Sequence, residues 1–278
     1  MANQHHRFIG SAKSGSQFTA RGALAAALLA SVLAAKAADA PLPTTGGSTA
    51  ALSAELMKPG LYRINGGGGG TLLRLGSNGL IVVDSNRAGQ YGPLMAQIRG
   101  IAQGVPVGAL VLTATGPGQI GNLAQFIDAG VPVVVQQRAQ TRAAGAARPR
   151  GSTSTKAFVT YGTDYMLRVG NVEAEVEHVG SGRTAVDSVV YFRDLRVLAV
   201  GELFTSATPE PDCASGGSFA GWAAAIAHLL WLDFDIAIPS RGAPVGKREL
   251  EAFKATLEAL AERGGTSPSR PSGCQPPR

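Results

Sequence analysis

Four short apolar segments between residues 71 and 137 limit the folds that this chain can adopt. They read TLLRL (71–75), LIVVDS (80–85), GALVLTA (108–114) and VPVVVQQ (131–137). A Ser-Asn-Gly turn joins the first two, and segments with the apolar spacing of helices, 92–100 and 121–130, follow the second and the third. Short runs rich in β-branched residues are typical of buried strands. Strands that alternate with helices predict a layered α/β domain.

The flanking sequence extends this pattern. LYRI (61–64) reads as a further strand, joined to 71–75 by the glycine run 66–70, which we expect to form a flexible hairpin over the site. That run lacks the Gly-Lys-Ser/Thr ending of a phosphate loop. After residue 158 we expect strands at 165–170, 171–179, 188–192, 196–203 and 234–240, with helices at 221–232 and 247–264. Two halves, each β-rich and then helical, predict a sandwich of two sheets.

The polar, basic segment 138–156 is expected to be an exposed loop or a frayed helix. It reads as a solvated connector, and the alternative is a contact with an anionic partner.

The first 40 residues read as a secretory leader. A basic region ends at Arg21, an apolar run of about 14 residues follows, and the small-residue patterns AKA and ADA come next. This run is shorter than the roughly 20 residues of a membrane span, although an uncleaved anchor is the alternative. We expect a leader (1–40), a linker (41–53), one domain (54–264) and a disordered Pro/Ser-rich tail (265–278). The domain would then be periplasmic or secreted, with no membrane span in the mature chain unless the leader stays uncleaved.

Charge and cysteine content add little. The formal charge is +6, but the leader holds four of the 25 basic and one of the 19 acidic residues, which leaves 21 and 18, a net charge of +3. No basic stripe with interleaved aromatic residues is present, so no nucleic-acid partner is expected. An oxidising compartment permits a disulfide between Cys213 and Cys274, and a free or intermolecular thiol is the alternative.

Four ordered segments resemble motifs of the metallo-β-lactamase fold family: GLIVVDS (79–85), HVGSGRTAVDSVVYF (178–192), RVLAVGELF (196–204) and DIAIPSRGAPVG (235–246). The resemblance implies an α/β fold, an αββα four-layer sandwich of two mixed β-sheets flanked by helices. It also implies a site at one edge, where strand-end loops of both sheets converge, and zinc-dependent hydrolysis.

The zinc ligands that the family uses are missing. With the family's Thr-His-x-His-x-Asp-His motif placed on Thr113, its four ligand positions fall on Ala114, Gly116, Gly118 and Gln119. The third histidine position is Arg183, the bridging aspartate position is Glu202 and the last histidine position is Arg241. Zinc requires about three converging nitrogen, sulfur or carboxylate donors, and arginine is a permanent cation that repels a metal. We therefore expect no metal and no other cofactor.

A relocated metal site has few candidates. His5 and His6 belong to the leader, and His228 falls on the helix expected at 221–232, where a packing role is the simpler interpretation. A mononuclear site from His178, Asp187 and Glu202 is the remaining alternative.

If the loops converge, Arg183 and Arg241 flank Glu202, with Gln119 nearby. Three interpretations follow: an ion-pair cluster that seals the vacant cavity, a pocket for a small anionic ligand, or hydrolysis with Glu202 or His178 as a base. Backbone N–H groups of the loop 113–122 could add donors to an anion pocket. The sequence thus predicts a non-catalytic pseudoenzyme that binds a small anion or an exported protein. The alternative is a hydrolase of esters, thioesters or lactams with an atypical or mononuclear site.

Overall fold

The computed structural model describes residues 51–147 and 157–265. The predicted leader, most of the predicted linker and the predicted tail lie outside these residues, as does Cys274. Cys213 does not carry a free thiol.

The first sheet has seven strands in sequence order. They are β1 (Ser53–Lys58), β2 (Leu61–Gly66), β3 (Gly69–Leu75), β4 (Leu80–Val83), β5 (Val107–Val111), β6 (Val133–Gln136) and β7 (Phe158–Tyr161). Strands β1 to β4 pair antiparallel, and β4 to β7 pair parallel. The parallel part is buried on both faces, which explains its continuous apolar runs.

The second sheet has five strands in the order β12-β11-β10-β9-β8. Their bounds are β8 (Asp164–Val169), β9 (Val172–His178), β10 (Ser188–Phe192), β11 (Val197–Gly201) and β12 (Ile236–Pro239). Strands β11 and β12 pair parallel and the others pair antiparallel.

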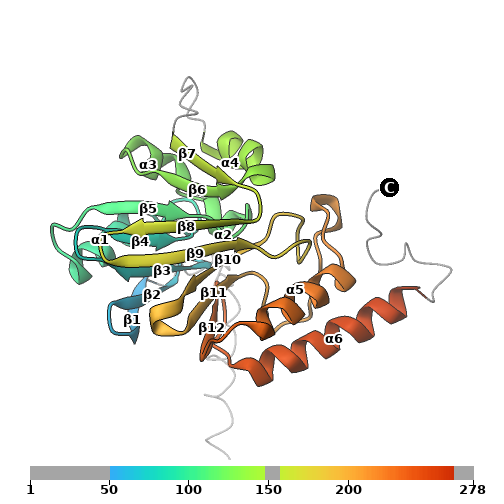
Figure 1. Cartoon of the computed structure of the whole chain (residues 1–278). Coiled ribbons are helices and arrows are strands. Elements are labelled where there is room, and N and C mark those ends of the chain that lie inside the picture. Colours follow the sequence, from blue (N-terminus) through green and yellow to red (C-terminus); the bar gives the residue numbers. More distant parts are fainter. Residues whose placement is uncertain (1–50, 148–156, 266–278) are drawn as a thin grey trace, which may run out of the picture. The chain divides into compact units, whose positions relative to one another are not determined.

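Helices complete the layers (Figure 1). They are α1 (Tyr91–Ile101), α2 (Pro117–Ile120), α3 (Leu123–Asp128), α4 (Gln140–Ala147), α5 (Phe219–Trp231) and α6 (Lys247–Gly265). Short 3-10 turns are η1 (Gln137–Ala139), η3 (Arg193–Leu195) and η4 (Cys213–Ser215).

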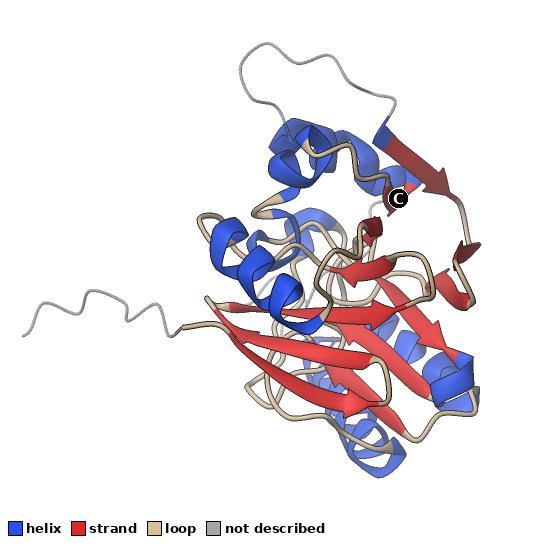
Figure 2. Ribbon diagram, turned by 90° about the vertical axis from the view of Figure 1, so that its left-hand side faces the viewer, coloured by secondary structure: helices blue, strands red, loops and turns tan. Residues whose placement is uncertain are grey.

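Three apolar clusters hold the layers together. One joins the first sheet to α1 and α3 through residues such as Leu94 and Phe126. A second lies between the two sheets, and a third joins the second sheet to α5 and α6 through Trp222, Phe253 and their neighbours. In Figure 2 the strands accordingly lie between helices. The order of layers is helix, sheet, sheet, helix, which confirms the predicted αββα sandwich of two mixed sheets.

The two sheets are in direct contact near the strand ends that carry the candidate site. A Cβ atom on Gly201, which has a φ of 55°, would lie 2.4 Å from Thr113 Oγ1. The Ser188 amide also donates to the Thr113 carbonyl at 2.8 Å. Glycine at position 201 therefore permits both the left-handed backbone and the close contact between sheets.

Several sequence predictions need correction. Strand β1 was not predicted, because its residues are mostly exposed and show no apolar alternation. Of the two alternatives for the basic segment, an exposed loop or a frayed helix, residues 140–147 form a helix, α4, with Ala143 fully buried, and residues 148–156 lie outside the described part. The glycine run, expected to form a flexible hairpin over the site, packs closely against backbone atoms of neighbouring segments. A Cβ on Gly69 would lie 3.2 Å from the Gly118 carbonyl oxygen, and one on Gly70 would lie 2.2 Å from the Ser240 carbonyl oxygen.

In the described residues, none of the helices has the length and apolar character needed to cross a membrane.

Candidate functional site

The candidate site lies where strand ends of both sheets meet. Asp84 follows β4, and Gln119 belongs to the short helix after β5. Glu202 follows β11 and Arg241 follows β12, while Arg183 lies in the loop between β9 and β10. Residues from five separate parts of the sequence thus converge at one edge.

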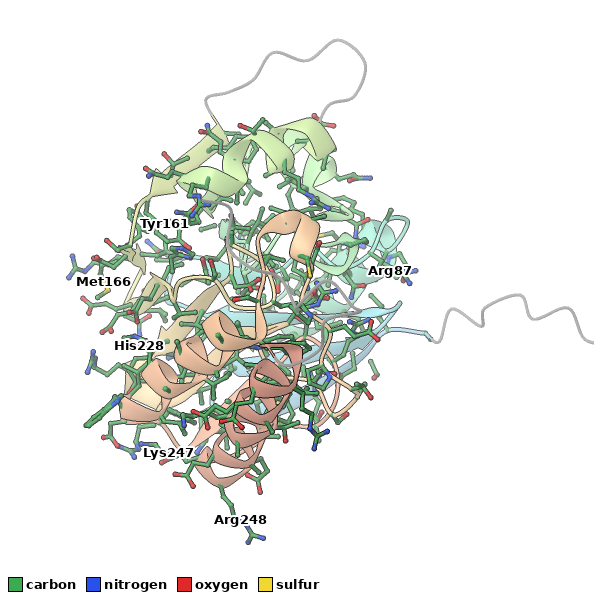
Figure 3. The ribbon with its side chains drawn as sticks, turned by 90° about the vertical axis from the view of Figure 1, so that its right-hand side faces the viewer. Arg87, Tyr161, Met166, His228, Lys247 and Arg248 are labelled. Carbon is green, nitrogen blue, oxygen red and sulfur yellow. The ribbon has the colours of Figure 1, made fainter. Side chains whose placement is uncertain are left out.

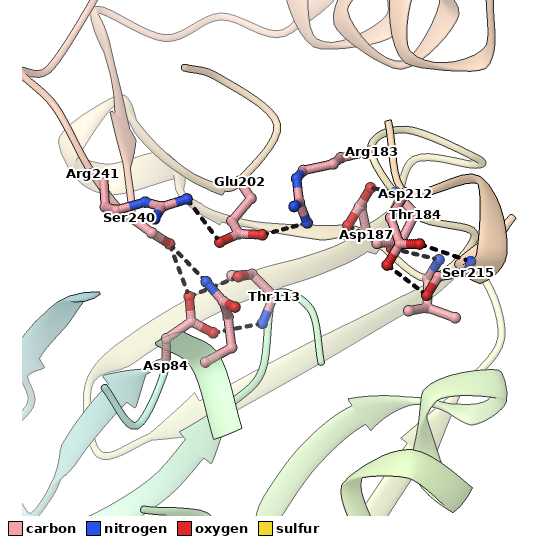
Figure 4. Close-up of polar contacts among 12 residues, drawn as sticks. Asp84, Thr113, Arg183, Thr184, Asp187, Glu202, Asp212, Ser215, Ser240 and Arg241 are labelled. Carbon is pink, nitrogen blue, oxygen red and sulfur yellow. Dashed lines mark hydrogen bonds and ion pairs between the residues drawn. The ribbon is translucent and has the colours of Figure 1, made fainter. Parts of the chain in front are cut away.

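Glu202 binds both predicted arginines (Figure 4). Arg183 Nη1 donates to Glu202 Oε2 at 2.8 Å, and Arg241 Nη2 donates to Glu202 Oε1 at 3.4 Å. The Glu202 side chain is 12% exposed, against 32% for Arg183 and 67% for Arg241. The Arg183 pair is therefore short and partly buried, whereas Arg241 is loosely held and open to solvent.

The backbone of Arg183 is fixed from two sides. Its carbonyl accepts a hydrogen bond from the Asp212 amide at 2.8 Å, and a Cβ on Gly217 would lie 1.9 Å from the same oxygen. On the other side, Asp187 accepts bonds from the Thr184 amide and hydroxyl, both at 2.7 Å. The loop thus presents the Arg183 side chain from a rigid base.

Asp84 and Asp187 are buried carboxyl groups, and no cationic side chain of the described residues binds directly to either of them. Burial raises the pKa of Asp84 to about 7, although hydrogen bonds from Thr113 oppose the shift. Burial likewise raises the pKa of Asp187 to about 6. Both carboxyls organise loops through hydrogen bonds and do not line the two cavities described below.

Gln119 links the cavity wall to Asp84. Its Nε2 donates to Ser240 Oγ at 3.3 Å, and Ser240 Oγ donates to Asp84 Oδ2 at 3.4 Å. Gln119 is 1% exposed, and its Oε1 has no hydrogen-bond partner among the described residues.

Two cavities flank the Arg183–Glu202–Arg241 cluster and share all three of its residues. One has a volume of about 160 Å³ and is also lined by Gly68, Gly69, Arg87, Pro117, Gly118, Gln119 and Ser240. We call it the hairpin cavity. The other, of about 170 Å³, is also lined by Gly201, Phe204, Thr205, Ala207, Thr208, Glu210 and Trp222. We call it the α5 cavity. Each volume is many times the ~10–15 Å³ that one buried water needs. The cluster therefore does not fill the space around it.

Arg87 was not predicted as a site residue. It lies in the loop between β4 and α1 and reaches the hairpin cavity because the β2–β3 hairpin folds back over that loop. No motif in the sequence marks it. The only signal was its place directly after the LIVVDS strand, at the edge where the other strand ends converge.

The residues at the family's zinc positions do not form a metal site. Ala114, Gly116 and Gly118 have no side-chain donor, and the one carboxylate, Glu202, is bound to two guanidinium groups. His178 Nδ1 contacts the Asp187 carbonyl oxygen at 2.8 Å, and the Asp187 side chain is engaged by Thr184. Within residues 51–147 and 157–265, no three His, Cys, Asp or Glu side chains are grouped so that they could hold a metal. The mononuclear alternative from His178, Asp187 and Glu202 is thus not supported.

The loop before α2 provides fewer anion donors than the sequence suggested. Pro117 has no N–H group, and the amides of Gln119 and Ile120 both donate to the Gly116 carbonyl. Side chains, not backbone amides, therefore dominate the polar chemistry of the cavity.

Solved structures share this architecture. A metallo-β-lactamase from Pontibacter korlensis superposes with a TM-score of 0.64 at 21% identity, covering 74% of this chain and 99% of that protein. The chain has the metallo-β-lactamase fold. The DIM-1 metallo-β-lactamase gives a TM-score of 0.62 at 16% identity, covering 75% of this chain and 97% of that one. The FIM-1 enzyme from Pseudomonas aeruginosa, in its mono-zinc form, gives 0.62 at 14% identity, covering 75% and 95%.

By sequence, no protein-family model and no curated protein matches the chain. The likeness to the metallo-β-lactamase fold is therefore one of architecture, and the side chains at the strand ends decide what this version of the fold can do.

Proposed function

We propose that this protein is an exported metallo-β-lactamase-fold protein that binds a small organic anion in the cleft around Glu202 and does not catalyse zinc-dependent hydrolysis. The supporting observation is that Arg183, Arg241 and Glu202 border two cavities instead of forming one sealed cluster. Guanidinium groups bind carboxylates and phosphates through paired N–H donors.

The absence of turnover follows from the donor set. Two guanidinium groups engage Glu202, which leaves it poorly placed to accept a proton from water. His178 directs Nδ1 to the Asp187 carbonyl and does not line either cavity. Binding is therefore easier to support than catalysis by either residue.

The test is calorimetric titration with benzoate and inorganic phosphate. We expect at least one of them to bind the parent and to lose ten-fold or more in affinity in the Arg183→Ala, Arg241→Ala double variant. Arg168→Ala is the matched control, because Arg168 is exposed and pairs with Glu173 on the second sheet. Equal binding by parent and double variant would overturn the anion site.

The competing hydrolase function is tested separately. We expect the purified protein to contain less than stoichiometric zinc and to show no chelator-sensitive turnover of ester, thioester or lactam substrates. Stoichiometric zinc together with chelator-sensitive turnover would reverse the proposal in favour of a hydrolase.

A further inference from the structure

The hairpin cavity carries an excess of positive charge that Arg183, Arg241 and Glu202 do not account for. Its wall holds three arginines, the third being Arg87, and one glutamate, which gives a formal charge of +2. The α5 cavity has two arginines and two glutamates, Glu202 and Glu210, and is formally neutral. The two cavities thus differ in charge although they share three residues.

Within the described residues, Arg87 combines an unpaired side chain with a backbone that is held by hydrogen bonds. Its guanidinium has no hydrogen-bond or ion-pair partner among the residues that the structure describes, whereas its backbone is tied down. The Arg87 amide donates to Asn86 Oδ1 at 2.7 Å, and its carbonyl accepts from Asn122 Nδ2 at 2.7 Å. Asn122 is fully buried and also donates to the Ser85 carbonyl at 2.6 Å.

The glycine hairpin makes room for this side chain. A Cβ on Gly68 would lie 2.6 Å from Arg87 Cδ and 2.9 Å from Arg87 Nη1, so the guanidinium lies directly against the hairpin. In Figure 3 Arg87 lies on the opposite side of the view from Met166 and His228. Its position is therefore set by the hairpin and by the anchored loop together.

Two of the three arginines are available to a ligand. Glu202 neutralises Arg183 through the 2.8 Å contact, while its bond to Arg241 is longer, at 3.4 Å, and the Arg241 side chain is 67% exposed. Arg241 and Arg87 thus remain as two cations that face the hairpin cavity. A compact group with two negative charges matches that arrangement better than a singly charged group does.

The α5 cavity offers a different surface. Phe204, Ala207 and Trp222 contribute apolar atoms beside the hydroxyls of Thr205 and Thr208. Both cavities border Arg183, Glu202 and Arg241, so a ligand that crosses this cluster would place a charged head on the hairpin side and an uncharged body on the α5 side.

We infer that the ligand is a phosphate monoester, or a phosphonate of the same charge, whose dianionic head binds between Arg87 and Arg241 and whose organic body occupies the α5 cavity. This inference rests on the proposed function and adds to it the charge of the ligand and a binding residue, Arg87. At pH 7.5 a phosphate monoester is mostly dianionic, since its second pKa is about 6. A sulfate monoester has nearly the same shape and a single charge.

The experiment compares phenyl phosphate with phenyl sulfate by calorimetric titration at pH 7.5. We expect the parent to bind phenyl phosphate at least ten-fold more tightly than phenyl sulfate. Arg87→Gln should weaken both ligands, phenyl phosphate by more than phenyl sulfate, and so reduce that preference to two-fold or less, while Arg87→Lys should retain part of the preference. Arg248→Gln, an exposed arginine at the start of α6 and distant from Arg87 in Figure 3, should change nothing.

The outcomes separate the inference from the proposed function. Equal affinity of the parent for both ligands, or a preference that persists in Arg87→Gln, overturns the dianion site while anion binding stands. If none of the four ligands binds (phenyl phosphate, phenyl sulfate, benzoate and inorganic phosphate), both the dianion site and the proposed anion-binding function are overturned. Comparison with inorganic phosphate tests the organic body: if phenyl phosphate binds no more tightly than inorganic phosphate, the α5 cavity has no part in binding.

Discussion

Asp84 accepts two hydrogen bonds from Thr113, one from the backbone amide to Oδ1 at 2.8 Å and one from the hydroxyl to Oδ2 at 2.7 Å. These bonds join the end of β4 to the residue two positions after β5, at the edge where the site is built. Asp84 also has a φ of 63°, a left-handed backbone that aspartate tolerates better than most residues. The carboxyl group thus fixes the geometry of the loop that carries Gln119.

The raised pKa of Asp84 predicts an unusual dependence of stability on pH. The Asp84 carboxyl has a pKa of about 7 in the folded protein and the ordinary aspartate value of 3.8 in the unfolded chain, so it binds a proton more tightly in the folded state. The free energy of unfolding should therefore be highest near pH 4 and fall as pH rises to about 8. At about 1.4 kcal/mol per pKa unit, the loss has an upper bound of about 4 kcal/mol. Urea unfolding at pH 5 and pH 8 measures this difference.

Asp84→Asn isolates the contribution of that carboxyl. The amide oxygen can still accept the bond from the Thr113 amide, while the ionisation is removed. We expect the pH dependence to shrink to the part that Asp187 contributes, with a pKa of about 6. An unchanged slope between pH 5 and pH 8 would show that Asp84 does not titrate in this range.

Glu202→Gln should lower stability and raise anion affinity at the same time. Removal of the carboxylate leaves the partly buried Arg183 without its charged partner at 2.8 Å. We expect the free energy of unfolding to fall by about 1–3 kcal/mol, a value between those for exposed and for buried ion pairs. The formal charge of the hairpin cavity rises by one, which should tighten phosphate binding several-fold. Glu173→Gln, which removes the exposed partner of Arg168, is the control and should alter neither quantity appreciably. Weaker phosphate binding by Glu202→Gln would contradict the electrostatic account.

Gly70→Ala should destabilise the protein by about 1–3 kcal/mol, the usual range for overpacking. The added Cβ would lie 2.2 Å from the Ser240 carbonyl oxygen, and a backbone atom cannot move aside cheaply. Gly145→Ala in α4 is the opposite case. No atom lies within 4 Å of its added Cβ, so we expect a gain of about 0.5–1 kcal/mol. Chemical denaturation measures both, and equal effects would show that the hairpin is not packed against β12 as described.

We expect the leader to be removed at one of its two small-residue patterns, so that the mature protein begins at Ala38, after AKA, or at Pro41, after ADA. Pro41 follows ADA directly and disfavours cleavage at that later pattern. Intact-mass analysis of protein exported by a bacterial host measures the cleavage site. A mass that corresponds to the full chain in the membrane fraction would support the uncleaved anchor instead.

Most of the fold was accessible from the sequence because its central strands are buried. LIVVDS and GALVLTA belong to the parallel part of the first sheet, where burial on both faces requires continuous apolar runs. Strand β1 lacked that signal, since an edge strand with exposed side chains reads like a linker. The sequence could not decide between a loop and a helix at α4, because this helix buries a single alanine and so lacks an apolar face.

The candidate site was accessible only in part. Arg183, Glu202 and Arg241 could be found because the segments that contain them resemble motifs of the metallo-β-lactamase fold family. Arg87 could not, because its role depends on the fold of the glycine hairpin, and a run of glycines does not reveal which side chain will lie against it. The difference in charge between the two cavities likewise depends on Glu210, which belongs to no motif.

The burial of Trp222 gives this protein a built-in optical reporter. Its indole Nε1 donates to the Leu203 carbonyl at 2.8 Å, and its ring borders the α5 cavity, whereas Trp231, the only other tryptophan, is 89% exposed. Iodide in solution should quench the emission of Trp231 selectively and leave the emission of Trp222. A change in that residual emission would signal occupancy of the α5 cavity directly, without any attached dye.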